Sequence, residues 1–178
     1  MATLNTADLN RQGKVFVAAN VSAKSVIAVT TAMTGVLLYN PAGSNKKLII
    51  IDGGFVWTTA PGAVHNIGWA LATPVQVGQG GPTSLTAIGS GVLAADGSGA
   101  ANNAVARAYD AATIVTAGVP VRWFMGATWG SSVGVSPYTS RDEVEGALVV
   151  VPGAAVMFTV VTTTAVGMGS MTWAEVPQ

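Results

Sequence analysis

The stretch that decides the fold is Ala147-Leu148-Val149-Val150-Val151-Pro152-Gly153, followed at once by Ala154-Ala155-Val156-Met157-Phe158-Thr159-Val160. Short runs of β-branched residues are typical of strands, and Pro-Gly is a strong turn signal. The stretch therefore predicts two apolar strands joined by a tight turn into a hairpin. A membrane-spanning helix would need about 20 continuous apolar residues, which the Pro-Gly pair interrupts.

Similar short apolar runs recur along the chain, each ended by turn residues. Gly53-Gly54 is expected to break or bulge one of them, because glycine has no side chain to pack in a strand. Alternation of large apolar side chains from Val119 to Met125 predicts a core strand. In the last run, Met171 and Trp173 fall on one face. The expected strands are 14–18, 36–39, 47–51, 55–57, 64–72, 104–113, 119–125, 147–151, 156–162 and 167–176.

These segments, separated by turn signals, predict an all-β fold. No helix of three turns is convincing between them, and no internal repeat suggests a propeller or a β-solenoid. We expect an antiparallel β-sandwich, jelly-roll-like, with about eight to ten short strands and long Gly-rich loops, among them residues 73–103. Residues 1–13 are polar and are assigned to an N-terminal arm, and residues 14–178 to a single β-sandwich domain.

The composition indicates a chain that associates. Of its 178 residues, 50% are hydrophobic and only 9% are charged, and the mean hydropathy is +0.51. Basic and acidic residues balance at eight each, so the formal net charge is zero. No basic stripe is present to hold phosphates, which argues against nucleic acid as a partner. Near-zero net charge also removes the repulsion that keeps monomers apart.

Few residues could carry chemistry. The chain has no cysteine and a single histidine, His65, which we expect to be a buried or interface residue. Asp142, Glu143 and Glu145 could contribute to a calcium loop, but a solvated loop is the preferred interpretation of the charged segment 139–145. We therefore predict no enzymatic activity, no catalytic residue, no cofactor and no metal ion.

Aromatic side chains in loops are the remaining candidates for binding. Trp57, Trp69, Trp123 and Trp173 have the spacing of core residues, whereas Trp129 lies in the loop-like segment Ala127-Thr128-Trp129-Gly130-Ser131-Ser132. Such a tryptophan could bind a ligand at a loop tip or pack at a subunit interface. The candidate interaction residues are Trp129, Tyr138 and Arg141.

Two parts of the sequence resemble a known class of proteins. One begins at Glu145-Gly146, runs through the Pro152-Gly153 turn and closes with Gly169-Ser170-Met171-Thr172-Trp173-Ala174-Glu175-Val176-Pro177. The other is Leu37-Leu38-Tyr39-Asn40-Pro41-Ala42-Gly43 with Lys47-Leu48-Ile49-Ile50-Ile51. Both are similar to hairpins and closing strands in jelly-roll structural proteins of tailed bacteriophage particles.

The resemblance implies a virion subunit, commonly trimeric, that decorates or cements a capsid or forms a head or tail appendage. Its partners would be copies of itself and the major capsid protein or other virion proteins, with no membrane involved. Its location would be the virion, assembled in the host cytoplasm. Two alternatives stay open: a receptor- or glycan-binding jelly roll of an appendage, and a jelly-roll enzyme such as a glycan hydrolase or isomerase.

Overall fold

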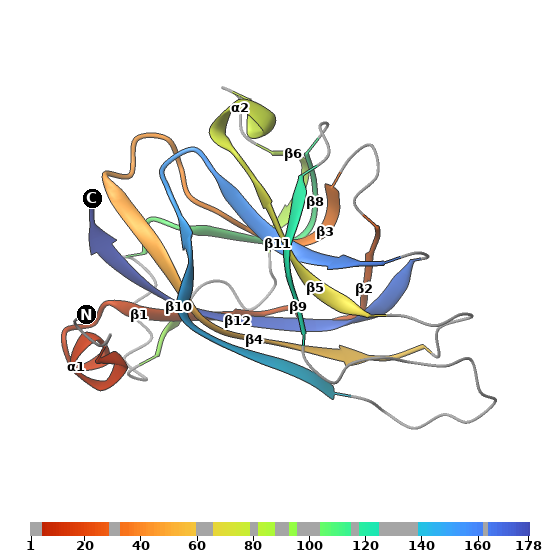
Figure 1. The fold of residues 1–178 in the computed structure, drawn as a ribbon, viewed down its shortest axis with the longest axis horizontal. Coiled ribbons are helices and arrows are strands. Elements are labelled where there is room, and N and C mark those ends of the chain that lie inside the picture. Colours follow the sequence, from red (N-terminus) through yellow and green to blue (C-terminus); the bar gives the residue numbers. More distant parts are fainter. Residues whose placement is uncertain are drawn as a thin grey trace.

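The computed structural model describes residues 5–28, 33–59, 66–78, 82–87, 93–95, 104–114, 118–124, 139–161 and 164–178. In this part of the chain, two antiparallel sheets face each other as a β-sandwich (Figure 1). The expected fold class is thereby confirmed. The described strands number twelve rather than eight to ten, because short strands such as β2 and β7 have too few residues to form a recognisable pattern.

The two sheets have six strands each. The first sheet has the order β10 (Thr139–Val150), β4 (Lys46–Trp57), β12 (Ala165–Pro177), β1 (Val15–Ala19) and β7 (Leu93–Ala94), with β2 (Lys24–Val26) paired to β12. The second sheet has the order β6 (Thr83–Ala87), β8 (Arg107–Ile114), β3 (Met33–Tyr39), β11 (Ala155–Val160), β5 (Ile67–Ala72) and β9 (Val119–Trp123).

Eight of these strands follow the wrapped path of a jelly roll. The chain alternates between the sheets so that β1-β12-β4-β10 lie side by side in one and β3-β11-β5-β9 in the other. The strands β6, β7 and β8 come between β5 and β9 in the sequence and extend both sheets at the side of β1 and β3. At the opposite side, β10 and β9 are the edge strands of the two sheets.

Both expected hairpins prove wrong. The strands joined by Pro152-Gly153 belong to different sheets, since β10 pairs with β4 whereas β11 pairs with β3 and β5. The same holds for β3 and β4 on either side of residues 40–45. A tight turn does reverse the chain at each place, but there it carries the chain across the core instead of closing a ladder.

The Gly53-Gly54 pair does not break its strand. β4 continues through both glycines, and the irregular register with its neighbours lies near Ile51 instead. The side chain of Trp69 explains Gly53, because a Cβ atom at this position would overlap the indole ring. Glycine is therefore needed here for space in the core.

Aromatic rings from both sheets fill the space between them. Phe55 of the first sheet lies with its ring centroid 5.9 Å from that of Phe158, which in turn is 4.8 Å from Trp69. Phe16 and Trp173 stack 6.2 Å apart nearer β1. All five side chains are buried. Trp57 and Met171 are buried as well, so the core positions expected for the tryptophans at 57, 69 and 173 are confirmed.

The middle of the second sheet is buried on both faces. Every residue of β11 is buried, and a second apolar cluster lies on the outer side of the sheet, with Leu37, Tyr39, Ala70, Tyr109 and Met157 among its members. The four-residue helix α2 (Pro74–Val77) contributes Val77 to this cluster. The other helix, α1 (Thr6–Arg11), has no buried residue and lies in the segment assigned to the N-terminal arm.

Candidate interaction surfaces

The edge strand β9 exposes large apolar side chains. Val119, Val121 and Trp123 are 55%, 42% and 37% exposed, although their alternation predicted a core strand. That expectation was wrong because β9 has a ladder partner on one side only, β5, within the described chain. Pro120 removes one main-chain donor from the strand, so the edge offers side chains more than hydrogen bonds.

An ion pair fixes β9 to the other sheet. Arg122 binds the buried carboxylate of Asp142 on β10 through both Nε, at 2.7 Å, and Nη2, at 3.0 Å. Trp69 Nε1 donates a further hydrogen bond of 2.9 Å to the same carboxylate. The hydrogen bond from Arg122 to Asp142 raises the pKa of the guanidinium above its ordinary value, against an opposing effect of desolvation. Arg122 therefore stays charged, and its charge is matched by Asp142.

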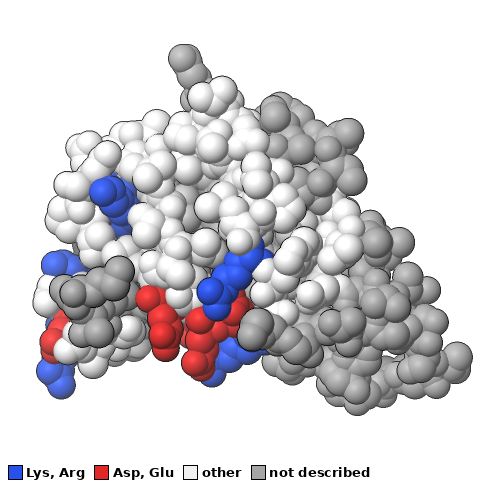
Figure 2. All heavy atoms as spheres, in the orientation of Figure 1, with Lys and Arg blue, Asp and Glu red and all other residues white. Residues whose placement is uncertain are grey.

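The strand β10 next to this edge carries charges of both signs. Arg141 and Glu143 point outward and are mostly exposed, whereas Ser140, Asp142 and Val144 between them are buried. The expectation of a solvated loop over 139–145 was therefore wrong, since the segment is a strand with one buried face. Figure 2 shows the charged groups of this face of the molecule mostly in its lower part, around β10 and α1, and an upper part that is largely uncharged.

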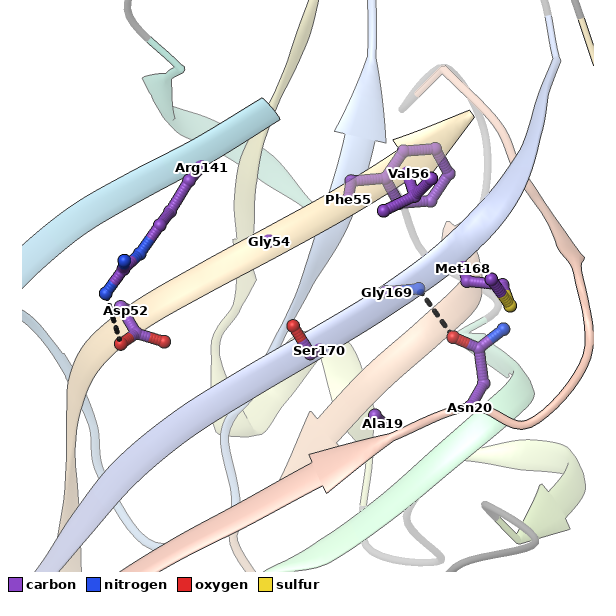
Figure 3. Close-up of a pocket in the computed structure, with 10 residues that line it drawn as sticks. All are labelled: Ala19, Asn20, Asp52, Gly54, Phe55, Val56, Arg141, Met168, Gly169 and Ser170. Atoms are coloured by element: carbon purple, nitrogen blue, oxygen red, sulfur yellow. Dashed lines mark hydrogen bonds and ion pairs between the residues drawn. The ribbon is translucent and has the colours of Figure 1, made fainter. Parts of the chain in front are cut away.

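A shallow groove crosses the outer face of the first sheet. Ala19, Ser170, Gly54 and Arg141 lie directly opposite one another on β1, β12, β4 and β10. Because the first three side chains are small, they leave a hollow of about 440 Å³. Figure 3 shows Arg141 and Asp52 at one end of it, and Met168 with Asn20 at the other.

The groove combines an apolar floor with a polar end. The guanidinium of Arg141 contacts Asp52 at 3.3 Å and Glu143 at 3.7 Å, so its charge is already balanced by two carboxylates. An anionic ligand would gain little here, while a neutral polar group could use the remaining N–H donors of Arg141. Asn20 is not available to a ligand, because its side chain binds main-chain groups of Gly167 and Gly169.

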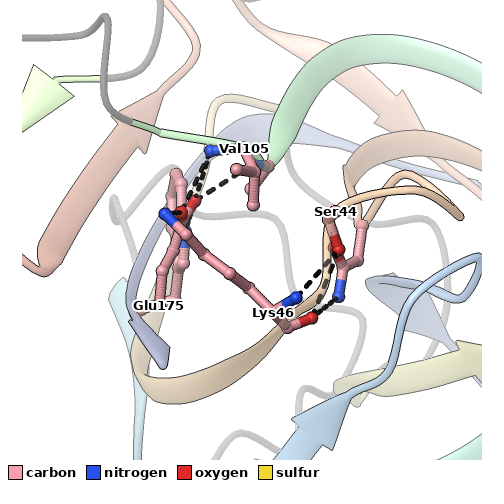
Figure 4. A network of polar contacts seen from close by, with 7 residues as sticks. Ser44, Lys46, Val105 and Glu175 are labelled. Carbon is pink, nitrogen blue, oxygen red and sulfur yellow. Dashed lines mark hydrogen bonds and ion pairs between the residues drawn. The ribbon is translucent and has the colours of Figure 1, made fainter. Parts of the chain in front are cut away.

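A buried carboxylate holds the segment at residues 104–106 against the first sheet. Glu175 on β12 accepts hydrogen bonds from the main-chain N–H groups of Val105, at 2.9 Å, and Ala106, at 3.0 Å. Lys46 Nζ lies 3.1 Å from the same carboxylate (Figure 4). Because these donors converge on one buried carboxylate, the network stabilises the fold.

The turns at one end of the sandwich form an uncharged tip. Residues 40–45, 73–78 and 151–154 contain no ionisable side chain, and Gly153 donates a main-chain hydrogen bond of 2.7 Å to Asn40. A Cβ atom at Gly153 would lie 3.1 Å from Cβ of Pro74, so the turn after β10 touches α2. Val75 on α2 is 91% exposed.

Of the three candidate interaction residues, Arg141 is the one that the structure describes, and it lies in the groove. Trp129, Tyr138 and His65 fall outside the described residues. The apolar edge at Val121 and Trp123 was missed as an interaction surface. Its sequence signal is Pro120 with Arg122 two residues later, since a charge and a proline within an apolar run favour an edge strand.

The described residues contain neither a cluster of metal ligands nor a membrane-spanning helix. No group of three or more His, Asp or Glu side chains among them is arranged to hold a metal ion. None of the helices described is long and apolar enough to cross a membrane. Comparison of the chain with protein-family models, curated proteins and solved structures gives no match.

Proposed function

We propose that the chain is a non-enzymatic structural subunit of a tailed-bacteriophage virion, which decorates or cements the capsid through contacts between subunits. Its partners are copies of itself and the major capsid protein or other virion proteins. Such a subunit binds only the assembled lattice and thereby adds interface free energy to the assembled state. Stable interfaces of this kind bury about 1,200–2,000 Å².

The observation that carries the proposal is the apolar edge at β9. Edge strands of soluble monomers are commonly protected by charged side chains. Here Val119 and Val121 stand exposed, and the one charge of the strand is taken up by Asp142. An exposed apolar surface of this type is typical of a contact site, and the virion as its setting rests on the resemblance described above.

The heat stability of capsids tests this role. Capsids of the phage that encodes the chain are heated with and without the purified protein, and release of DNA is followed with an intercalating dye. Saturable protection, reached at a fixed number of copies per capsid, is the expected result. Unchanged release at every protein concentration would contradict a cementing role.

A second candidate is a receptor- or glycan-binding module of a head or tail appendage. The groove at Arg141 favours it, because a neutral sugar can place its C–H face on Ala19 and Met168 and its hydroxyl groups on Arg141 and Asp52. Binding to a glycan array tests this function, and binding that Arg141→Ala abolishes would support it. No binding to any glycan, or binding that Arg141→Ala leaves unchanged, would contradict a glycan-binding role of the groove.

A further inference from the structure

We propose that two copies of this chain associate face to face through the outer face of the first sheet, at β4 and β10. Ile49 and Val149 lie at the centre of the contact, and Lys47 of each copy faces the carboxylates of Asp52 and Glu143 in the other. This inference rests on the proposed function as a subunit that contacts its own copies, and it assigns the surface that does so.

Three residues of β4 occupy successive positions on this outer face: Lys47, Ile49 and Asp52. The core residues Leu48 and Ile50 alternate with them and point the other way, and the irregular register after Ile50 takes up one residue. The ladder partners of the three on β12 are therefore evenly spaced, at Val176, Ala174 and Thr172. Since a strand rises about 3.3 Å per residue, Lys47 and Asp52 lie about 7 Å to either side of Ile49.

The edge strand β10 continues two of these rows. Val149 pairs with Ile49 and is 41% exposed, and Glu143 pairs with Asp52 and is 65% exposed in its side chain. The residues next to Val149 and Glu143 on β10 are buried on the inner face. One row across the two strands is therefore apolar, and the next is acidic.

The charges on the two sides of the apolar row are not balanced within the chain. Lys47 forms no ion pair with any residue that the structure describes. Asp52 and Glu143 share one cation, Arg141, at 3.3 and 3.7 Å, so one negative charge is in excess at this end. A positive end, an apolar row and a negative end thus follow one another along the outer face.

This order of charges identifies the occupant as a second copy. Half a turn about an axis along the apolar row brings two sheets face to face and reverses the strand direction. Ile49 and Val149 then meet their own counterparts, and Lys47 of each copy faces the acidic end of the other. Sheets that pack face to face keep their strands within about 30° of one another, which preserves this arrangement. A partner with charges of one sign would be repelled at one of the two ends.

The contact is isologous, so the expected species is a dimer and not the trimer that the resemblance implies. The mass of the full chain in solution tests this, measured by light scattering over a dilution series without capsids. The wild type is expected at twice the chain mass of 17.8 kDa. Val149→Glu should weaken the dimer about tenfold or more, because it brings like charges together at the centre.

Val121→Glu is the matched control and should leave the dimer intact. Val121 is 42% exposed, against 41% for Val149, and it lies on the edge strand of the other sheet. Circular dichroism and melting curves show whether each variant is folded.

A charge swap tests how the two copies face each other. Lys47→Glu alone should weaken the dimer about tenfold, because symmetry changes two ion pairs at once. Glu143→Lys alone should weaken it likewise. The two substitutions together reverse the charge at both ends, and the double variant should return to within about threefold of the wild type.

A dimeric wild type that Val149→Glu dissociates without unfolding, and a dimer restored by the charge swap, would support the proposal. A monomeric or trimeric wild type overturns it, as does a dimer that Val149→Glu leaves intact or that Val121→Glu dissociates equally. A double charge variant no tighter than the single ones contradicts it too. If Val149→Glu fails to fold, the charge variants decide alone.

The capsid experiment separates this inference from the function on which it rests. Capsid protection by a monomeric wild type would overturn the dimer and leave the proposed function standing. A dimer with the expected variants that protects no capsid would do the reverse.

Discussion

At the scale of single residues, space and charge in the core decide which substitutions the chain tolerates. Gly53 is needed because the ring of Trp69 occupies the volume above it, and Glu175 because several donors converge on its carboxylate. Neither requirement can be read from the sequence. Gly53 was interpreted there as a strand breaker, and Glu175 as part of a terminal motif, because the partner of each lies far away along the chain.

Gly53→Ala is expected to destabilise the fold by about 1–3 kcal/mol, since the added methyl group forces Trp69 or the strand to shift. Gly54→Ala is its neighbour control: a Cβ atom there meets Ser170 Oγ at 3.2 Å and no ring. Its cost should be below about 1 kcal/mol. Urea unfolding measures both, and equal costs would mean that Trp69 does not confine this position.

Glu175→Gln should cost about 1.5–3 kcal/mol, because the neutral amide has one acceptor oxygen in place of two and loses the ion pair with Lys46. Glu143→Gln, at an exposed carboxylate of the same charge, should change the stability by less than about 0.5 kcal/mol. Chemical denaturation of the two variants side by side gives the comparison. A Glu175→Gln variant as stable as the wild type would show that the network contributes little.

At the scale of elements, the sequence predicts that strands exist better than it predicts their neighbours. Apolar runs located β5, β11 and β12 correctly, because a half-buried or buried strand shows in its own residues. Apolar alternation placed β9 in the core, since an edge strand can carry the same pattern. The Pro-Gly signal joined the strands now seen as β10 and β11 into a hairpin, because such a turn looks the same whether it closes a ladder or crosses between sheets.

The turn at Pro152-Gly153 gives a prediction at this scale. Gly153 has φ of +83°, a conformation that costs a residue with a side chain about 1–2 kcal/mol, and Pro74 restricts the space beside it. Gly153→Ala should therefore lower the free energy of unfolding by at least that amount. Gly43→Ala, in the turn between β3 and β4, meets no atom within 4 Å and should be close to neutral. Thermal unfolding of both tests whether this backbone conformation matters.

The ion pair between Arg122 on β9 and Asp142 on β10 gives another prediction at this scale. Arg122→Ala leaves the carboxylate of Asp142 buried without its cation and should cost about 3–5 kcal/mol, whereas Arg11→Ala on exposed α1 should cost almost nothing. The raised pKa of Arg122 means that its contribution to stability is fully present below the ordinary pKa of a guanidinium and is lost only as the pH rises through the raised pKa. Unfolding curves at about pH 6 and pH 9 should therefore show the same difference between Arg122→Ala and the wild type. A difference that changes between these pH values would contradict this role of the guanidinium.

At the scale of the whole molecule, few charges and the exposed apolar edge at β9 are the two features that support the proposed role as a subunit. The balance of eight acidic and eight basic residues is visible in the sequence, and the association that it predicts stays a prediction. The exposed edge at β9 cannot be read from the sequence, because exposure depends on which strand ends a sheet. Trp129 and Tyr138 stay predictions, since they lie outside the described residues, whereas the groove gives Arg141 a defined place.

Sedimentation with capsids tests the central claim most directly. The purified protein is centrifuged with and without capsids of the phage that encodes it, and the bound copies are counted by quantitative mass spectrometry. We predict saturable binding at a stoichiometry that matches a repeated site of the capsid lattice. Protein that stays in the supernatant at every concentration, while capsids pellet, would contradict a structural role on the particle.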